Sequence, residues 1–338
     1  MRPLMTLLGG LLTGLVAACA APDGAATAST AAVPGYATVM DMPVPGGASG
    51  WAYQVLDAHT KRLYLAQSGA GRVVVVDLAQ ARVAATVPGI GSAHGLALAA
   101  GLGRLYVTAM ASNEVAVVDV SSVRVVDHIP AGRAPDGLAY VSSPGRLFVS
   151  DSDGPGLTVI DVQNNQPRSR IELGDGVGDS QYDPWSGRVL VAVAGRRELV
   201  ALDPSSAAVV ATYPLPGCDG AQGVQVDVSG QDRVFVACEG NARLLGVDLH
   251  TGAVSAPVEV GAGPDILALD PMLHRLYVAS ASGILTVVDT SGADPAVLAR
   301  GYAGPDAHSV AVDPDTHLVY LPLTGVRGRS VVRVLAPQ

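Results

Sequence analysis

Short apolar runs alternate with turn-forming residues along most of this chain, and residues 103–141 show the pattern most clearly. Runs that begin at Arg104, Glu114 and Val123 are rich in Val, Leu and Tyr. Each run is bounded by Gly, Pro, Asp or Ser, as is typical of β-strands joined by turns. A glycine-containing link at 131–137 leads into the next apolar run at 138–141. The pattern predicts an all-β chain built from short strands.

The same unit recurs seven times. One mark of the unit is a residue at the start of a strand: Arg62, Arg104, Arg146, Arg188, Arg233, Arg275 and, in the last unit, Leu318. Successive marks lie 42, 42, 42, 45, 42 and 43 residues apart. A period of about 40–45 residues with four strands is typical of one blade of a β-propeller. We therefore expect seven blades of four antiparallel strands.

The two ends of the chain predict how the ring closes. The seventh unit ends without an outer strand, whereas residues 36–46 resemble the outer strands at 123–132 and 209–217. A ring with an unpaired edge would be prone to association, a hazard that closed architectures avoid. We expect the N-terminal strand to pair into the last blade.

Residues that recur in most units are most simply structural. An aspartate ends the third strand of six units, at Asp77, Asp119, Asp161, Asp203, Asp248 and Asp289. Its short carboxylate suits the capping of the turn that follows. The arginine marks are expected to cover apolar surface with their stems while their charged ends stay in solvent.

The first residues predict export and anchoring. Arg2 precedes an apolar run at 4–16 that is too short to span a bilayer, so 1–18 is expected to be a signal peptide. The small residues before Cys19 resemble a bacterial lipobox, in which that cysteine is lipidated; an ordinary secretory signal is the alternative. Residues 19–35 are expected to be a flexible tether and 36–338 a single propeller domain. The protein would then be a membrane-anchored lipoprotein on the periplasmic or cell-surface side.

The strand marks also carry a family resemblance. Three of them are Leu63-Tyr64-Leu65-Ala66, Leu105-Tyr106-Val107-Thr108 and Leu276-Tyr277-Val278-Ala279. They resemble the YVTN-type propeller repeat, and residues 36–338 as a whole are similar to the YncE-like family. Some copies are degenerate, including 188–191 and 319–322. The resemblance implies the architecture but leaves the activity open, because such folds serve binding proteins, surface proteins and enzymes.

The net charge of the chain limits the classes of partner that we expect. It has 21 basic and 30 acidic residues, and Lys61 is its one lysine. No basic stripe of the kind that binds nucleic acid is present, so a nucleic-acid partner is not expected.

Residues that differ between the units are the better candidates for a site. Counting back from each mark gives the start of each inner strand, and these residues are expected to ring one mouth of the central channel. They are Trp51, His94, Asp136, Asp179, Gln222, Asp265 and His308. The ring has three carboxylates and two imidazoles but no Lys or Arg, and crowded carboxylates raise one another's pKa or take up a cation.

Two interpretations of this ring stay open. His94, His308, Asp136 and Asp265 are of the types that ligate a divalent transition metal. Alternatively the channel is filled with water, and the imidazoles bond to neighbouring backbone.

The cysteines of the propeller predict a crosslink. Cys218 precedes an inner strand and Cys238 ends the next one, which returns to the same end of the blade. Exported proteins keep disulfides, so we expect a Cys218–Cys238 bridge, with two reduced buried thiols as the alternative.

The preferred function is a binding or scaffold protein with a ligand or partner at one channel mouth. The alternative is a metal-dependent enzyme, of the lactone hydrolase or lyase kind, that uses the mouth residues for metal or acid–base chemistry. The sequence lacks Cys-x-x-Cys, Gly-x-Ser-x-Gly and a phosphate loop. No catalytic constellation therefore favours the enzyme.

Overall fold

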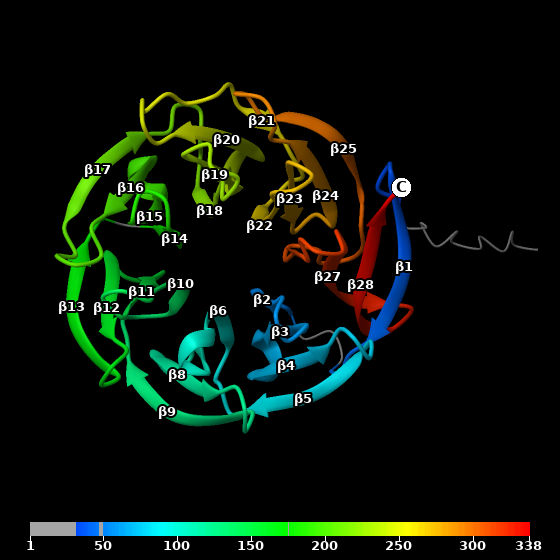
Figure 1. Cartoon of the computed structure of the whole chain (residues 1–338), viewed down its shortest axis with the longest axis horizontal. Helices are drawn as coiled ribbons and strands as arrows, with labels where there is room; N and C mark the ends of the chain where they lie inside the picture. Colours follow the sequence, from blue (N-terminus) through cyan, green and yellow to red (C-terminus); the bar gives the residue numbers. More distant parts are fainter. Residues whose placement is uncertain (1–31, 47–49, 175) are drawn as a thin grey trace, which may run out of the picture. The chain divides into compact units, whose positions relative to one another are not determined.

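Seven sheets of four antiparallel strands surround a central channel in the computed structural model, which describes residues 32–46, 50–174 and 176–338 (Figure 1). This confirms the predicted all-β, seven-bladed propeller. The predicted signal peptide at 1–18, Cys19 and residues 20–31 of the tether lie outside the described residues. Within those residues, no helix is long and apolar enough to cross a membrane.

Blades 1 to 3 follow one another in sequence. Blade 1 contains β2 (Gln54–Asp57), β3 (Arg62–Gln67), β4 (Arg72–Asp77) and β5 (Arg82–Pro88). Blade 2 contains β6 (Ala93–Ala99), β7 (Arg104–Ala109), β8 (Glu114–Asp119) and β9 (Arg124–Pro130). Blade 3 contains β10 (Pro135–Val141), β11 (Arg146–Asp151), β12 (Gly156–Asp161) and β13 (Gln166–Glu172).

Blades 4 to 6 repeat this order. Blade 4 contains β14 (Val177–Asp183), β15 (Arg188–Val193), β16 (Glu198–Leu202) and β17 (Val209–Pro214). Blade 5 contains β18 (Ala221–Val226), β19 (Arg233–Cys238), β20 (Arg243–Asp248) and β21 (Val258–Glu259). Blade 6 contains β22 (Pro264–Asp270), β23 (Arg275–Ser280), β24 (Ile284–Asp289) and β25 (Ala296–Tyr302).

Blade 7 combines the two ends of the chain. It contains β26 (Ala311–Val312), β27 (Val319–Val326), β28 (Arg329–Pro337) and, as its outer strand, β1 (Tyr36–Pro43). In the described part of the chain, short 3₁₀ helices follow second or inner strands: η1 (Ser68–Ala70), η2 (Ala100–Leu102), η3 (Ala194–Arg196) and η4 (Glu239–Asn241).

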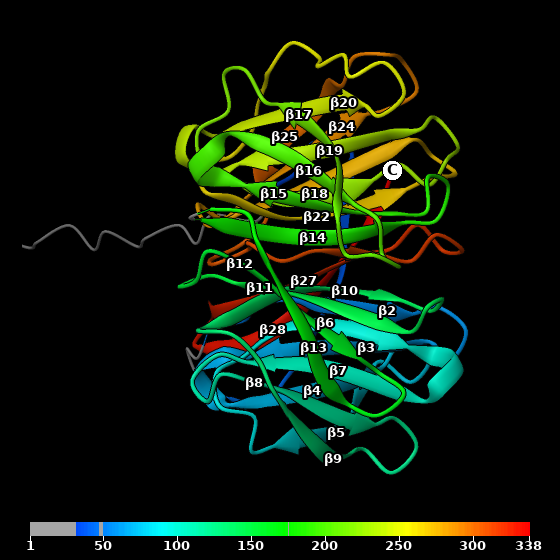
Figure 2. The same ribbon diagram turned by 90° about the vertical axis from the view of Figure 1, so that its left-hand side faces the viewer.

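The burial of the strands follows their place in the blade. The middle strands are buried on both faces, as in β8, whereas outer strands such as β9 are mostly exposed. Figure 2 shows the ring from the side, with the strands of successive blades crossing its width. Sheets that pack face to face bury both sides of their central strands, which explains the near-continuous apolar runs in the sequence.

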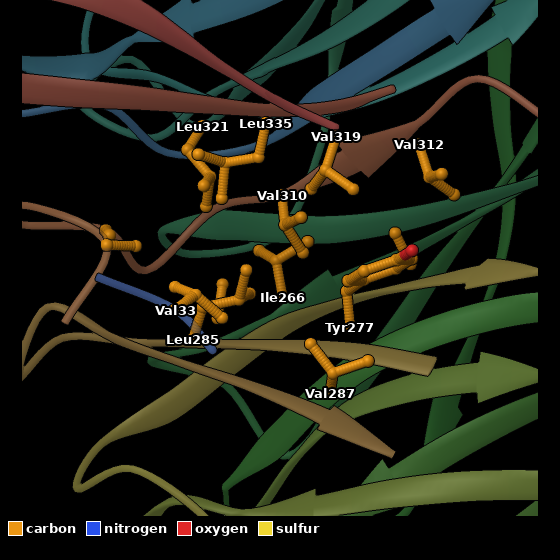
Figure 3. Close-up of a cluster of buried hydrophobic side chains, with 14 of the residues drawn as sticks. Val33, Ile266, Tyr277, Leu285, Val287, Val310, Val312, Val319, Leu321 and Leu335 are labelled. Carbon is orange, nitrogen blue, oxygen red and sulfur yellow. The ribbon is translucent and has the colours of Figure 1, made fainter. Parts of the chain in front are cut away.

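The core is divided among the interfaces between blades. Figure 3 shows the cluster between blades 6 and 7, where Ile266, Tyr277 and Val287 meet Val319 and Leu321. Comparable clusters occupy the other interfaces in the described part of the chain. Each blade is therefore stabilised by its two neighbours, and the ring depends on its own closure.

The closure occurs as predicted. Strand β1 pairs antiparallel with β28, from Tyr36 opposite Pro337 to Pro43 opposite Val331, and the two lie side by side in blue and red in Figure 1. Across this pair, the guanidinium of Arg333 donates to both carboxylate oxygens of Asp41, at 2.8 and 2.7 Å. A third bond from Arg333 reaches the carbonyl of Ala303, before the last blade.

Two residues before the predicted start of the propeller at residue 36, Ala32 and Val33, already contact it. The Ala32 N–H donates to the carbonyl of Tyr302 in β25. Val33 is only 4% exposed and belongs to the core cluster of Figure 3. A single valine among small residues has no periodic pattern, so the composition of the tether did not reveal its burial.

The recurring aspartates cap turns as expected. Each mark accepts a backbone N–H from a residue two or three positions later, as Asp119 does from Ser122 at 2.8 Å. The prediction for the arginine marks is wrong in two blades, because Arg146 and Arg233 are buried. Arg146 donates to the carbonyls of Pro204 and Ser205, in a turn of the next blade.

Arg233 makes a similar contact two interfaces further on, between blades 5 and 6. It pairs with buried Asp227 at 2.8 Å and donates to the carbonyls of Thr290 and Gly292 in blade 6. Turn carbonyls that are shielded from water need donors, and these guanidinium groups supply them. The two arginines therefore join neighbouring blades.

The disulfide prediction is confirmed. Cys218 and Cys238 are bonded, and their Cα atoms lie 5.3 Å apart. The bridge joins the segment before β18, which belongs to the lengthened step, to the end of β19.

The ion pair between Arg333 and Asp41 at the ring closure is expected to contribute measurably to stability. Replacing Arg333 by Met should lower the free energy of unfolding by about 2 kcal/mol, because Asp41 loses its charged hydrogen-bond partner. Equilibrium unfolding in urea would measure the change. Arg329→Met, on the exposed start of the same strand, is the control. An Arg333→Met protein as stable as this control would contradict the stabilising role of the Arg333–Asp41 ion pair.

Candidate functional site

Bulges in the inner strands determine which side chains reach the channel. The register between the inner and second strands shifts between Ala93 and Leu96, and at the equivalent positions of blades 3, 4, 5 and 6. The predicted ring residues His94, Asp136, Asp179, Gln222 and Asp265 all lie inside these shifts. A bulge displaces its residues from the ladder and re-aims their side chains. We call the end of the channel where the inner strands begin the strand-start mouth, and the opposite end the hairpin mouth.

Glycines beside the ring residues let neighbouring inner strands approach closely. A Cβ at Gly95 would lie 2.2 Å from the carbonyl oxygen of Asp136, and one at Gly223 would lie 2.0 Å from that of Asp265. Thr108 fixes the first of these contacts: its hydroxyl accepts the Gly95 N–H at 2.7 Å and donates to the Asp136 carbonyl at 2.8 Å. The ring is therefore held by backbone contacts between blades.

His94 and Asp136 form one pair at the strand-start mouth. His94 Nε2 lies 3.9 Å from Asp136 Oδ1. Burial raises the pKa of Asp136; the charge of His94 opposes this shift and that of Glu239 adds to it. Asp136 Oδ1 and His94 Nδ1 are buried, and neither has a hydrogen-bond partner among the described residues.

Asp265 and His308 form a second group. Burial raises the pKa of Asp265 to about 7, against the charge of His308 and with that of Asp136. His308 Nδ1 lies 2.9 Å from Asp306 Oδ1. Burial alone would lower the pKa of His308, but the hydrogen bond to Asp306 and the charge of Asp265 raise it.

Asp179 lies deeper in the channel than the two pairs. It is 7% exposed and accepts a hydrogen bond from the hydroxyl of Tyr53. Because Tyr53 precedes β2 and Asp179 lies in β14, this bond crosses the channel from blade 1 to blade 4. Burial, together with the charge of Asp265, raises the pKa of Asp179 well above its usual range.

Two of the predicted ring residues, Trp51 and Gln222, belong to neither of these groups of interacting side chains. Trp51 is 2% exposed and packs with Leu63 and Val332 in the core between blades 7 and 1, so its indole does not line the mouth. Gln222 is half-buried in the bulge of β18, and its backbone lies against Gly178.

The metal hypothesis is not supported by the positions of the side chains. In residues 32–46, 50–174 and 176–338, no three His, Cys, Asp or Glu side chains are grouped so that they could hold a metal ion. His94 faces Asp136 whereas His308 faces Asp306, so the two imidazoles belong to separate pairs. His94, His308, Asp136 and Asp265 therefore do not form one ligand set.

Three residues of the site were missed in the sequence. Tyr53, Glu239 and Asp306 each interact with a ring residue. Glu239 follows Cys238, the residue at which a second strand returns to the strand-start mouth. This place in the repeat could have identified Glu239 as a residue of the strand-start mouth. The contact of Tyr53 crosses the channel, and the local sequence does not specify it.

Comparison with known proteins supports the fold. No protein-family model matches the sequence, and no curated protein matches it. The structure is similar to Kuenenia stuttgartiensis hydrazine synthase, with a TM-score of 0.75 and 18% identity over 86% of this chain and 97% of that one. It is also similar to the WD40 repeats of RRP9, with a TM-score of 0.75 and 10% identity over 91% of this chain and 100% of that one.

A third solved structure, of U3-55K, has a TM-score of 0.74 and 10% identity, over 89% of this chain and 98% of that one. The shared fold is a seven-bladed β-propeller. At these identities the similarity extends to the fold alone.

The raised pKa of Asp265 predicts how stability depends on pH. The free energy of unfolding should fall as the pH rises from about 4 to about 7, because an unfolded aspartate loses its proton near pH 3.9 and the folded one near 7. Between these values the folded chain binds more protons, so each increase in pH favours unfolding. The shifts of Asp136 and Asp179 act in the same direction.

Urea unfolding at several pH values within this window would measure the effect, and Asp265→Asn should flatten the profile. Asp315→Asn is the control, since the pKa of this exposed carboxyl is lowered by Lys61 and its effect falls below the window. A profile for Asp265→Asn as steep as that of the unmodified protein would contradict the shift.

Proposed function

We propose that this chain is a lipid-anchored, extracytoplasmic propeller of the YVTN-type, YncE-like kind that binds a partner at its strand-start mouth. β-Propellers commonly act as scaffolds or binding platforms. The marks at 63–66, 105–108 and 276–279 carry the family proposal. The partner proposal is carried by the chemistry of the mouth.

The observation that carries it is the pair of unsatisfied atoms at this mouth. Asp136 Oδ1 and His94 Nδ1 are buried without hydrogen-bond partners. Such atoms cost free energy unless a partner satisfies them. With Asp265 and Glu239 nearby, the mouth is acidic, and none of the seven predicted ring positions is Lys or Arg. A basic segment of a protein partner, which offers donors and positive charge, fits this mouth best.

The enzyme alternative lacks a comparable observation. The described residues contain no group that could hold a metal. Burial raises the pKa of Asp265, whereas that of His308 is raised, against the effect of its burial, by the hydrogen bond to Asp306 and the charge of Asp265. Burial and neighbouring charges shift pKa values in binding sites as well as in active sites. Binding is therefore the function that we propose.

The anchor proposal is consistent with where the tether meets the propeller. Ala32 bonds to Tyr302 at the end of β25, the outer strand of blade 6. The first described residues therefore lie beside an outer strand of the ring. The Cys218–Cys238 bond suits an oxidising compartment outside the cytoplasm.

Lipidation can be tested on the full chain. The unmodified protein should enter the detergent phase on phase separation and carry an acyl group detectable by mass spectrometry, whereas Cys19→Ala should stay in the aqueous phase. The Cys218→Ala, Cys238→Ala double variant, which keeps Cys19, should still enter the detergent phase. Partition of the unmodified protein into water would count against the anchor.

The partner site can be tested by photo-crosslinking in the cells that produce the chain. A benzoylphenylalanine placed at Glu239, above the mouth, should give a discrete adduct with a protein partner. The same residue at Val126, exposed on the outer strand β9, should give none. Asp136→Asn should weaken the adduct, because the mouth loses an acceptor. Equal labelling from both positions, or none from Glu239, would overturn the proposal.

A further inference from the structure

The other half of the channel contains a cavity that the proposed partner site does not use. Its volume is about 480 Å³, within the range of small-molecule sites, which is roughly 300–1,000 Å³. Residues of all six long inner strands, or directly before them, line it. Pro184 and Val228, in the hairpins after β14 and β18, also contribute, so the cavity reaches the hairpin mouth.

The Tyr53–Asp179 hydrogen bond forms the inner end of this cavity. Both residues belong to its lining, and their bond crosses the channel. The residues of the strand-start mouth, including His94, Asp136 and Asp265, are not part of the lining. The cavity is therefore a second compartment, separate from the proposed partner site.

The walls combine an apolar belt with aromatic and amide side chains. The belt is formed by Leu96, Leu138, Ile266 and Leu267. Tyr53, Tyr140 and Tyr182 add aromatic rings, and Gln54, Gln181 and Gln225 add amides. Among the described residues of the lining, Asp179 is the one acidic group, and no Lys, Arg or His occurs.

We propose that this cavity binds a small organic amine in its ammonium form, with the charged nitrogen against Asp179 and the apolar part of the ligand within the apolar belt. A buried carboxyl with no cationic neighbour must either keep a proton or accept a cation. Aromatic rings attract organic cations, and the belt can bury an apolar group of the ligand.

The surrounding charges favour a cation over an anion. Asp265 lies close enough to raise the pKa of Asp179, and Asp136 and Glu239 add negative charge beyond it. The imidazoles on that side, those of His94 and His308, each face a carboxylate of their own. A carboxylate or phosphate ligand would meet repulsion in the cavity.

Binding is coupled to the loss of one proton. Burial and the charge of Asp265 raise the pKa of Asp179, which favours the protonated form of this carboxyl in the free cavity. When the ammonium group binds, the carboxyl proton leaves for the solvent and an ion pair forms, to which Tyr53 still donates its hydrogen bond. The affinity should therefore rise as the pH increases toward neutrality.

Calorimetric titration of the full chain with tryptamine and phenethylamine tests the proposal. Their uncharged counterparts, tryptophol and 2-phenylethanol, replace the ammonium group by a hydroxyl and are the matched controls. At least one amine should bind with one-to-one stoichiometry, and its alcohol should bind about tenfold more weakly or worse. Titrations in two buffers of different ionisation heat should reveal about one proton released per amine.

The variants locate the binding. Asp179→Asn should remove the preference for the amine and the proton release. Asp136→Asn removes only a more distant charge at the other mouth, so it should keep both and lower the affinity less. Gln225→Lys introduces a competing cation in the wall and should weaken amine binding at least about tenfold without changing Asp179. It serves as the second variant if Asp179→Asn does not fold.

Several results would overturn the proposal. They are the absence of amine binding at millimolar concentrations, equal binding of the alcohols, and loss of binding in Asp136→Asn but not in Asp179→Asn. The last result would place the amine at the strand-start mouth. Because the crosslinking at Glu239 reports on that mouth separately, either proposal can fail while the other stands.

Discussion

The close approach of neighbouring inner strands around the channel axis is the constraint on which the rest of this propeller depends. At Gly95 and Gly223, a carbonyl oxygen of the next strand occupies the place that a Cβ would need. The bulges make this packing compatible with function, because they take the adjacent residues out of the ladder and aim them into the channel. Thr108 then satisfies the backbone groups at one such contact. The same local geometry therefore holds the blades together and supplies the channel with polar side chains.

Burial in this channel gives aspartate a behaviour opposite to that in the turns. Asp119 accepts hydrogen bonds from Ser121 and Ser122 in an exposed turn, and these bonds lower its pKa. Asp265 has few such partners, and burial raises its pKa to about 7. Because the residue type is the same, the environment alone assigns one aspartate to the scaffold and the other to the site.

The repeat period and the hydrophobic pattern were enough to predict the blades, their closure by β1 and the Cys218–Cys238 bond, since each depends on strand order. The side-chain directions at the channel were harder to predict. Successive residues of a strand face opposite sides, so an offset of one residue places Trp51 in the core between blades. Arg146 escaped prediction for another reason: its partners are carbonyls of the next blade, and the period of the sequence does not specify contacts between blades.

One position of the repeat differs between the blades, and these differences explain which side chains enter the channel. Nine residues before the mark of each blade, or ten in the lengthened unit, blades 2, 3 and 5 have glycine, whereas blades 1 and 4 have Tyr53 and Asp179. These choices depend on one another: a Cβ at Gly137 would lie 2.8 Å from Asp179 Oδ1 and 3.2 Å from the Tyr53 hydroxyl. The bond that divides the channel thus requires a glycine in the blade beside it. Propellers that share the fold at 10–18% identity need not share this arrangement, because the fold constrains the strands and leaves this position free.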